Sequence, residues 1–272
     1  MYYAKVIADS VNKFATRATT VEVCYPRIIL AELNTHRMFS RNTSSSRAIP
    51  VMTLIKQVWN KPFIPTYWGK NKAGMQAKEE LTGYELLVAK GLWLAASKFA
   101  CGFAYLFSKI GLHKQIANRI IEPWMWTKTI ITATEWDNFF ELRNHPDAQP
   151  EIKKLAELIE EAIAESKPKF LFQGQWHLPY VTAQEKNEYS LNECLKFSAA
   201  RCARVSYLTH DKQMPSLAHD ILLHDMLVGT DPKHASPVEH QLTVASDEKF
   251  YYNVRSFKSY RWFIENGKHI SE

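Results

Sequence analysis

Two kinds of hydrophobic pattern alternate along this 272-residue chain, and their alternation constrains the fold more than any other feature. β-Branched and aromatic residues crowd residues 2–11, 17–26 and 123–134, as is typical of strands. Helical periodicity marks a stretch ending near residue 110, residues 148–167, the run after Ser190 and residues 216–227. No repeat or low-complexity linker interrupts them. The pattern predicts one α/β (α+β) domain over residues 1–272, with a mixed twisted sheet, long helices and a possible helical insertion at about 76–112.

Local signals predict where several helices begin. Pro26 precedes an apolar helical pattern over residues 27–37, and residues 35–50 are expected to form a loop. Thr134 and Asp137 have the spacing of a capping box, which predicts a helix over residues 135–143. Ser190 and Glu193 have the same spacing and predict a second capped helix.

The most apolar stretch, residues 86–107, is interrupted by Lys90 and Lys98. A membrane span needs about 20 nearly uncharged residues, so we expect a long and deeply packed helix here. The four cysteines show no C-x-x-C spacing, and the first ten residues do not look like a secretory segment. We therefore expect a cytoplasmic protein with reduced thiols.

The net charge of +6 favours anionic partners. It does not distinguish a nucleotide from a nucleic acid, but no basic block suggests a disordered nucleic-acid arm. The segment "THRMFSRNTSSSRAIP" (35–50) combines Arg37, Arg41 and Arg47 with small hydroxyl residues. Planar guanidinium groups suit phosphate, although the segment lacks the glycines of a Walker or dinucleotide motif. By itself it fits an anion cradle and a solvated loop equally well.

Other chemistry has weaker support. Five histidines fall between residues 210 and 240, but their spacing matches no metal motif, and we expect no metal site. No cysteine or serine has the neighbours of an activated nucleophile. Arg143 follows an apolar run, as either a snorkelling side chain or a fixed cation. The segment "GQWHLPY" (174–180) fits an aromatic platform or a packed loop.

Together these segments resemble the flavin-dependent thymidylate synthases. The family signature R-H-R-x-x-S-x-N-E-x-S-x-R is matched in register by "THRMFSRNTSSSR", with Thr35 and Thr43 in place of an arginine and a glutamate. The matching positions are His36, Arg37, Ser40, Asn42, Ser45 and Arg47. "RIIEP" (119–123) resembles a second family segment. "TATEWDNFFELRNHPDAQPEI" resembles a third, in which Thr132 and Thr134 replace an asparagine and an arginine.

Two further motifs occur in an unusual order. "CARVSY" (202–207) and "HASPVEH" (234–240) resemble segments that in the family precede the arginine signature, whereas here they follow it. The order looks circularly permuted, which an intact site tolerates when the termini lie close together. We therefore expect the two ends of the chain to meet near the site.

The resemblance implies a mixed α/β fold and a homotetramer with shared flavin sites. It implies conversion of dUMP to dTMP by methylenetetrahydrofolate and by FAD that NADPH reduces, and we expect neither a membrane nor a nucleic acid as partner. By position Ser45, Arg47, Arg119 and Glu32 would bind the nucleotide, and Arg143 would polarise the uracil ring. The residues implied to line the flavin are His36, Arg37, Ser40, Asn42, Asn138, Ser206, His234 and Ser236.

Departures from the family pattern leave other activities open. The positions of Thr35 and Thr134 lack cations that the family directs toward flavin, and Glu32 stands where the family commonly has glutamine. A carboxylate repels a nearby phosphate unless it is protonated, bridged or turned away. The alternatives are the same chemistry on another pyrimidine nucleotide, namely methylation or hydroxymethylation of dCMP, or a non-catalytic nucleic-acid-binding relative.

Overall fold

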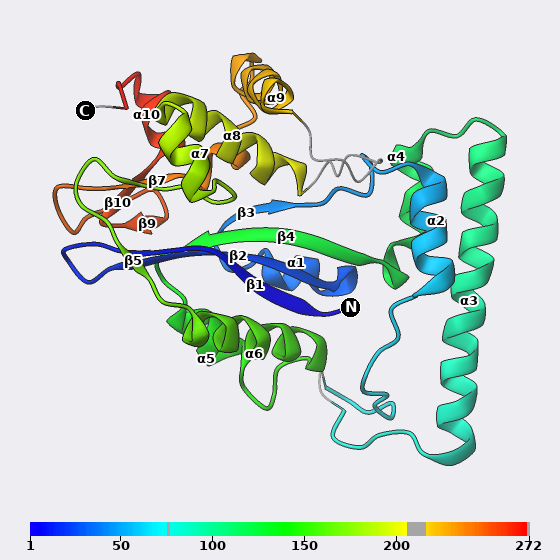
Figure 1. The fold of residues 1–272 in the computed structure, drawn as a ribbon. Coiled ribbons are helices and arrows are strands. Elements are labelled where there is room, and N and C mark those ends of the chain that lie inside the picture. The colour runs from blue at the N-terminus through cyan, green and yellow to red at the C-terminus, as the bar shows by residue number, and fades with distance from the viewer. Residues whose placement is uncertain (75–76, 206–215, 271–272) are drawn as a thin grey trace.

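A five-stranded sheet with the order β3-β4-β2-β1-β5 occupies the centre of the computed structural model, which describes residues 1–74, 77–205 and 216–270 (Figure 1). Only β1 and β5 pair in parallel, so the sheet is mixed, as predicted. Its strands are β1 (Tyr3–Val11), β2 (Arg17–Pro26), β3 (Ser40–Thr43), β4 (Trp126–Ala133) and β5 (Lys169–Phe170). The three strand-like segments of the sequence therefore form β1, β2 and β4.

Helices and two small sheets surround this central sheet. A three-stranded sheet has the order β10-β7-β6, and β8 pairs with β9. These strands are β6 (Trp176–His177), β7 (Leu242–Val244), β8 (Phe250–Tyr251), β9 (Val254–Arg255) and β10 (Phe257–Ser259). The helices are α1 (Leu30–Leu33), α2 (Val51–Asn60), α3 (Gly83–Lys109), α4 (Lys114–Ala117), α5 (Asp137–Arg143), α6 (Pro150–Glu165), α7 (Ala183–Glu188), α8 (Leu191–Arg204), α9 (Leu217–Gly229) and α10 (Tyr260–Asn266). Short 3-10 helices are η1 (Arg27–Ile29), η2 (Asn118–Trp124) and η3 (Ser236–Glu239).

One face of the central sheet is apolar and packs against α6. Val21 and Val23 lie two positions apart in β2, so their side chains point to the same face. There they meet Ile152 and Leu155 of α6 in one buried cluster. The amphipathic pattern over residues 148–167 thus correctly predicted a helix with one buried face.

The opposite face is covered by α8 and is more polar. Ile130 of β4 packs against Cys202 at the end of α8, and the strand positions beside it carry buried threonines. The capping box at Ser190 and Glu193 starts α8, as the sequence predicts.

Several local predictions are wrong. The helix expected over residues 27–37 is only η1 and α1, and part of the expected loop is the edge strand β3. Thr134 does not cap a helix, because α5 begins at Asp137 and has Trp136 as its N-cap. The Thr134 hydroxyl instead accepts a hydrogen bond from the backbone N–H of Arg255 at 3.0 Å.

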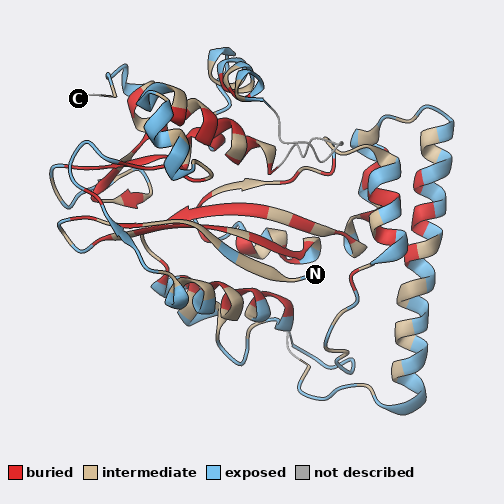
Figure 2. Cartoon of the chain, viewed as in Figure 1, coloured by how far each residue is buried: buried red, intermediate tan, exposed pale blue. Residues whose placement is uncertain are grey.

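The long apolar helix is also not deeply packed. α3 stands beside α2 across one end of the central sheet, and most of its length is exposed (Figure 2). Only one side of α3, including Ala100, Cys101 and Ala104, packs against α2 and η2. α3 is long and apolar enough to cross a membrane. Core helices of soluble proteins share this length and composition, so the property does not identify a membrane span.

Candidate functional site

The edge strand β3 brings the arginine-rich segment next to segments far along the chain. The Asn42 side-chain amide donates to the Cys202 carbonyl at 2.6 Å, and the Asn253 amide donates to the Ser40 hydroxyl at 2.9 Å. The 3-10 helix η3 also contacts β3. The carboxy-terminal segments therefore reach this strand, but β1 does not, because β4 and β2 lie between them. Ser206 lies outside the described residues.

The last residue of α5 contacts the start of the same segment. Arg143 donates from Nε to His36 Nε2 at 2.9 Å and from an Nη to the Thr35 hydroxyl at 3.3 Å. Phe139, one helical turn earlier, packs its ring against the His36 ring at a centroid distance of 4.9 Å. Two residues that the sequence singles out for separate reasons, His36 and Arg143, are thus in direct contact.

His36 is held neutral and in one tautomer. Burial, followed by the positive charges of Arg143 and Arg41, lowers the pKa of His36 to about 4. A guanidinium can only donate, so His36 Nε2 accepts and the ring proton lies on Nδ1. His36 therefore presents a fixed N–H donor at Nδ1.

A carboxylate holds Arg119 in a second cluster. Glu122 accepts from Arg119 at 2.9 Å, from Arg27 at 3.0 Å and from the Ser46 hydroxyl at 2.5 Å. The neighbouring Ser45 is half-buried. Arg119 is therefore at least partly neutralised, and an incoming phosphate would compete with Glu122 for it.

The remaining candidate residues lie on open surface or end in an unpaired atom. Arg37, Arg47, Asn138, His234 and Ser236 are all exposed. Within residues 1–74, 77–205 and 216–270, neither exposed arginine has a carboxylate partner. Glu32 Oε2 is buried and has no hydrogen-bond partner in that same part of the chain.

This donor set fits the groups of a flavin nucleotide. Unpaired guanidinium groups suit its diphosphate, and the His36 N–H and the Asn138 amide suit its ring oxygens. A ligand N–H would satisfy the buried Glu32 oxygen.

Sequence reasoning missed a chain of five buried polar side chains. Ser10 Oγ lies 2.8 Å from His177 Nδ1, and His177 Nε2 lies 2.7 Å from Thr20 Oγ1. Thr20 and Thr132 are cross-strand partners whose hydroxyls lie 2.6 Å apart, and Thr132 lies 2.8 Å from His240 Nδ1. Threonines are ordinary strand formers, so no local sequence signal predicts this hydrogen-bonded path.

The two histidines of this hydrogen-bonded path, His177 and His240, are neutral. Burial is the main cause that lowers the pKa values of His177 and His240 to about 3, and each histidine is almost fully inaccessible. The path ends at His240 Nε2, which has no hydrogen-bond partner among the described residues. His177 belongs to the "GQWHLPY" segment, so this part of the segment is packed rather than an open platform.

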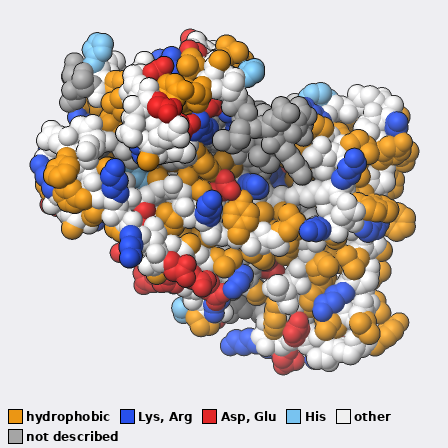
Figure 3. Space-filling view, viewed as in Figure 1, with side chains coloured by type: hydrophobic (Ala, Val, Ile, Leu, Met, Phe, Trp, Pro, Cys, Tyr) orange, Lys and Arg blue, Asp and Glu red, His pale blue; other side chains and the backbone are white. Residues whose placement is uncertain are grey.

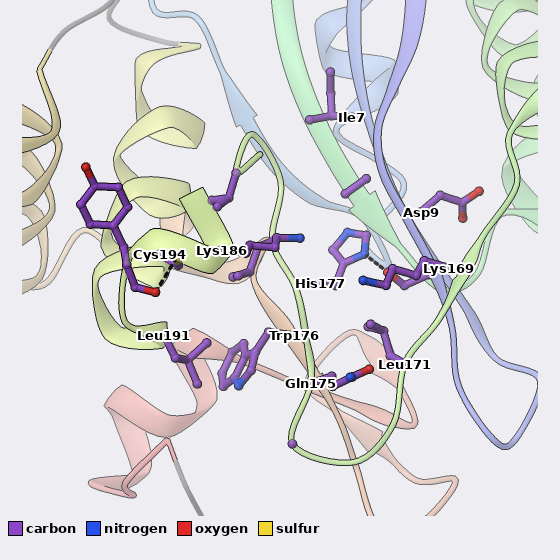
Figure 4. A pocket seen from close by; sticks show the side chains of 16 residues that line it. Ile7, Asp9, Lys169, Leu171, Gln175, Trp176, His177, Lys186, Leu191 and Cys194 are labelled. Carbon is purple, nitrogen blue, oxygen red and sulfur yellow. Dashed lines mark hydrogen bonds between the residues drawn. The ribbon is translucent and has the colours of Figure 1, made fainter. Parts of the chain in front are cut away.

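A cavity of about 490 Å³ opens beside His177 (Figure 4). Its walls come from β1, α7, the start of α8 and residues 169–178. Trp176, Lys169 and Lys186 are among the residues that line it, and none of the residues implied to bind nucleotide or flavin does. The cavity is therefore separate from the candidate site.

A family model described as "Thymidylate synthase complementing protein" matches residues 12–169, more than half of the chain. A crystal structure of a UMP/dUMP methylase, PolB from Streptomyces cacaoi, bound with 5-Br dUMP, has 15% identity and a TM-score of 0.50. The alignment covers 61% of this chain and 90% of that one, and the likeness shows a common fold. A structure of PolB with 5-Br UMP has 16% identity and a TM-score of 0.48, with 61% and 89% coverage. No curated protein matches the chain.

Proposed function

We propose that this chain, which belongs to the thymidylate synthase complementing protein family and is a pyrimidine nucleotide methyltransferase, converts dUMP to dTMP with methylenetetrahydrofolate and FAD. NADPH is the proposed reductant. The contact between Arg143 and His36 carries the proposal, because it joins the two signature-like segments inside the matched range, residues 12–169. The UMP/dUMP methylase with the same fold supports a pyrimidine nucleotide as substrate.

The nucleotide side of the site relies on fixed cations. Arg47 binds the phosphate with help from the Ser45 hydroxyl, and Arg119 joins them when the phosphate displaces Glu122. Arg143 stabilises negative charge on a ring oxygen, which makes C5 of the pyrimidine more nucleophilic. The contacts of Arg143 with His36 and Thr35 hold its guanidinium in place before the reaction, so little reorganisation is needed.

The flavin side of the site relies on neutral donors and one cation. The bound flavin supplies the hydride that completes the methyl group. Arg37 binds the diphosphate, and His36 donates from Nδ1 to a ring acceptor. Because the His36 pKa is about 4, this imidazole remains a neutral donor at physiological pH. Ser40 and Asn42 lie in β3, and the contacts of β3 with Cys202 and η3 support a flavin site that also includes His234 and Ser236 in a permuted order.

We also propose a cytoplasmic homotetramer, because many candidate flavin residues are exposed and a second copy would enclose them. The four cysteines are unpaired and buried, which fits a reducing compartment. The alternative acceptor is dCMP, which the unpaired Glu32 oxygen favours because the cytosine amino group is a donor that uracil lacks at that position.

A visible absorption spectrum of the protein with added FAD tests the proposal first. We expect bound flavin that NADPH bleaches, and then turnover of dUMP with methylenetetrahydrofolate. Turnover of dCMP but not dUMP would assign the other acceptor. Failure to bind FAD, together with steeply salt-dependent binding of long nucleic acid, would contradict the enzymatic function and support a non-catalytic nucleic-acid-binding relative.

A further inference from the structure

Two lysines face the cavity beside His177. Lys169 lies in β5 and Lys186 in α7, on opposite walls, and Figure 4 shows both ammonium groups pointing toward His177. No ion pair to either lysine occurs in the described part of the chain. Asp9 also lines the cavity, but Arg17 binds both of its carboxylate oxygens, at 2.9 and 2.6 Å.

We propose that this cavity binds a small aromatic anion, with its phosphate or carboxylate groups between Lys169 and Lys186 and its ring on the Trp176 side. About 490 Å³ is within the usual range for small-molecule sites. Partial burial, followed by repulsion from Lys169, lowers the pKa of Lys186, so a bound anion would relieve an existing cost. His177 is neutral, so the positive charge that faces the cavity comes from the two lysines.

The floor of the cavity is rigid, which favours a preformed site. Ser10 and Thr20 fix the His177 ring from both sides, and Tyr260 and Phe263 pack against Trp176. A ligand therefore orders few side chains when it binds, apart from the two lysines.

Calorimetric titration with phenyl phosphate and with phthalate tests this proposal and distinguishes phosphate from carboxylate recognition. We expect at least one probe to bind with a dissociation constant of about 1 mM or less. Lys169→Ala and Lys186→Ala should each weaken binding about tenfold, whereas Lys56→Ala, on the exposed side of α2, should not. Absence of binding by both probes, or equal binding by all three variants, would overturn the proposal.

A second inference rests on the exposed face of α3. Along this helix the large exposed apolar side chains form one continuous stripe, visible as hydrophobic groups along the edge of the molecule in Figure 3. They are Tyr84, Leu87, Val88, Leu92, Phe99, Phe103, Tyr105, Leu106 and Ile110, with exposed fractions from 38% to 80%. At roughly 150–200 Å² per side chain, the stripe exposes on the order of 1,000 Å². Monomers rarely expose apolar patches so large, and a standard interface buries about 800 Å² per partner.

The stripe is complementary to itself when two copies run antiparallel. With the two-fold axis at the level of residue 97, Leu92 faces Gly102 of a second copy and Phe103 faces Gly91. A side chain at either glycine would meet nothing within 4 Å in the chain itself, so each glycine leaves room for a partner's side chain. The same axis places Phe99 opposite Ala95. Large residues thus meet small ones near the middle of the contact, and towards its ends Val88 faces Leu106 and Tyr84 faces Ile110 in apolar pairs.

Oppositely charged residues near the two ends of α3 also fit the two-fold axis at residue 97. Glu85 and Lys109 are equally far from residue 97, so each would face the other across an antiparallel pair. We infer that α3 is a two-fold interface between two copies of this chain. A membrane-spanning role fits α3 less well, because its other side packs on α2, where Lys98 lies over the Trp59 ring at 4.4 Å and donates to the Trp59 carbonyl.

Sedimentation velocity on charge and surface variants tests this interface. Phe99→Glu should halve the mass of the assembly, while Leu222→Glu, at an exposed leucine of α9, should leave it unchanged. Lys109→Glu should raise the dissociation constant about tenfold, and adding Glu85→Lys should restore it. Unchanged mass in Phe99→Glu would overturn the inference. So would binding of the wild-type chain to anionic vesicles as a monomer, because α3 would then face lipid.

Discussion

The two buried histidines predict a specific loss of stability in acid. His177 and His240 have pKa values of about 3 in the folded chain, against about 6.5 when unfolded. Between these values the unfolded chain binds more protons, so stability is fully present above pH 6.5 and falls as the pH is lowered toward 3. From pH 6.5 to pH 4.5, each histidine should cost about 2 kcal/mol, because each pKa unit is worth about 1.4 kcal/mol and titration near pH 6.5 is only partial.

A substitution can isolate this contribution from that of the carboxylates. His240→Gln removes the titrating group, while its amide can still hydrogen-bond to the Thr132 hydroxyl. Urea denaturation of the wild type and the variant should be measured at pH 6.5 and pH 4.5. The loss of unfolding free energy between these pH values should be smaller in the variant by about 2 kcal/mol.

The matched control is His145→Gln. His145 is exposed, so this variant makes the same imidazole-to-amide change outside the buried hydrogen-bonded path. Equal losses in the wild type and in His240→Gln would refute the inference that His240 is buried as a neutral ring. The chain of hydroxyls and imidazoles would then not be the arrangement that the protein has in solution.

Other predictions address the candidate site and its support. Arg143→Ala should lower kcat by about 100-fold, and Arg143→Lys should not restore it, since the single nitrogen of a lysine cannot reproduce the separate Nε and Nη donors that reach His36 and Thr35. Near-normal turnover would remove Arg143 from the mechanism. Thr20→Val should lower the unfolding free energy by about 1–3 kcal/mol because it leaves His177 Nε2 unpaired, and Thr20→Ser, which keeps the hydroxyl, should cost less in the same denaturation assay. All four cysteines are buried and burial raises the pKa of Cys24 to about 11, so a thiol-reactive disulfide reagent at pH 8 should modify none until the chain unfolds; rapid labelling of the native protein would contradict this burial.

The central elements could be predicted because their local patterns agree with their packing. The strands at 3–11 and 17–26 carry β-branched residues, and α6 has an apolar stripe that meets the same face of the sheet. The capping box of α8 was also sufficient, because Ser190 and Glu193 satisfy each other without any help from distant residues.

Predictions failed where distant residues decide the outcome. Thr134 has the spacing of a cap, but its hydroxyl accepts from Arg255, far along the chain. The apolar residues 86–107 predict a deeply packed helix, yet most of α3 is exposed, because apolar composition does not reveal whether a partner covers a face. The contact between His36 and Arg143 was not predicted, because the family resemblance assigns His36 to the flavin and Arg143 to the nucleotide. The buried path from Ser10 to His240 depends on register between strands, which no local motif encodes.

The most direct test of the proposed function is release of tritium from dUMP labelled at C5. Replacing that hydrogen by a methyl group must release the label, and only C5 chemistry does so. We predict release that requires the protein, methylenetetrahydrofolate, FAD and NADPH together, and that drops about 100-fold in Arg143→Ala. Absence of release from dUMP, and equally from C5-labelled dCMP, by protein that binds FAD would contradict pyrimidine methylation by this chain.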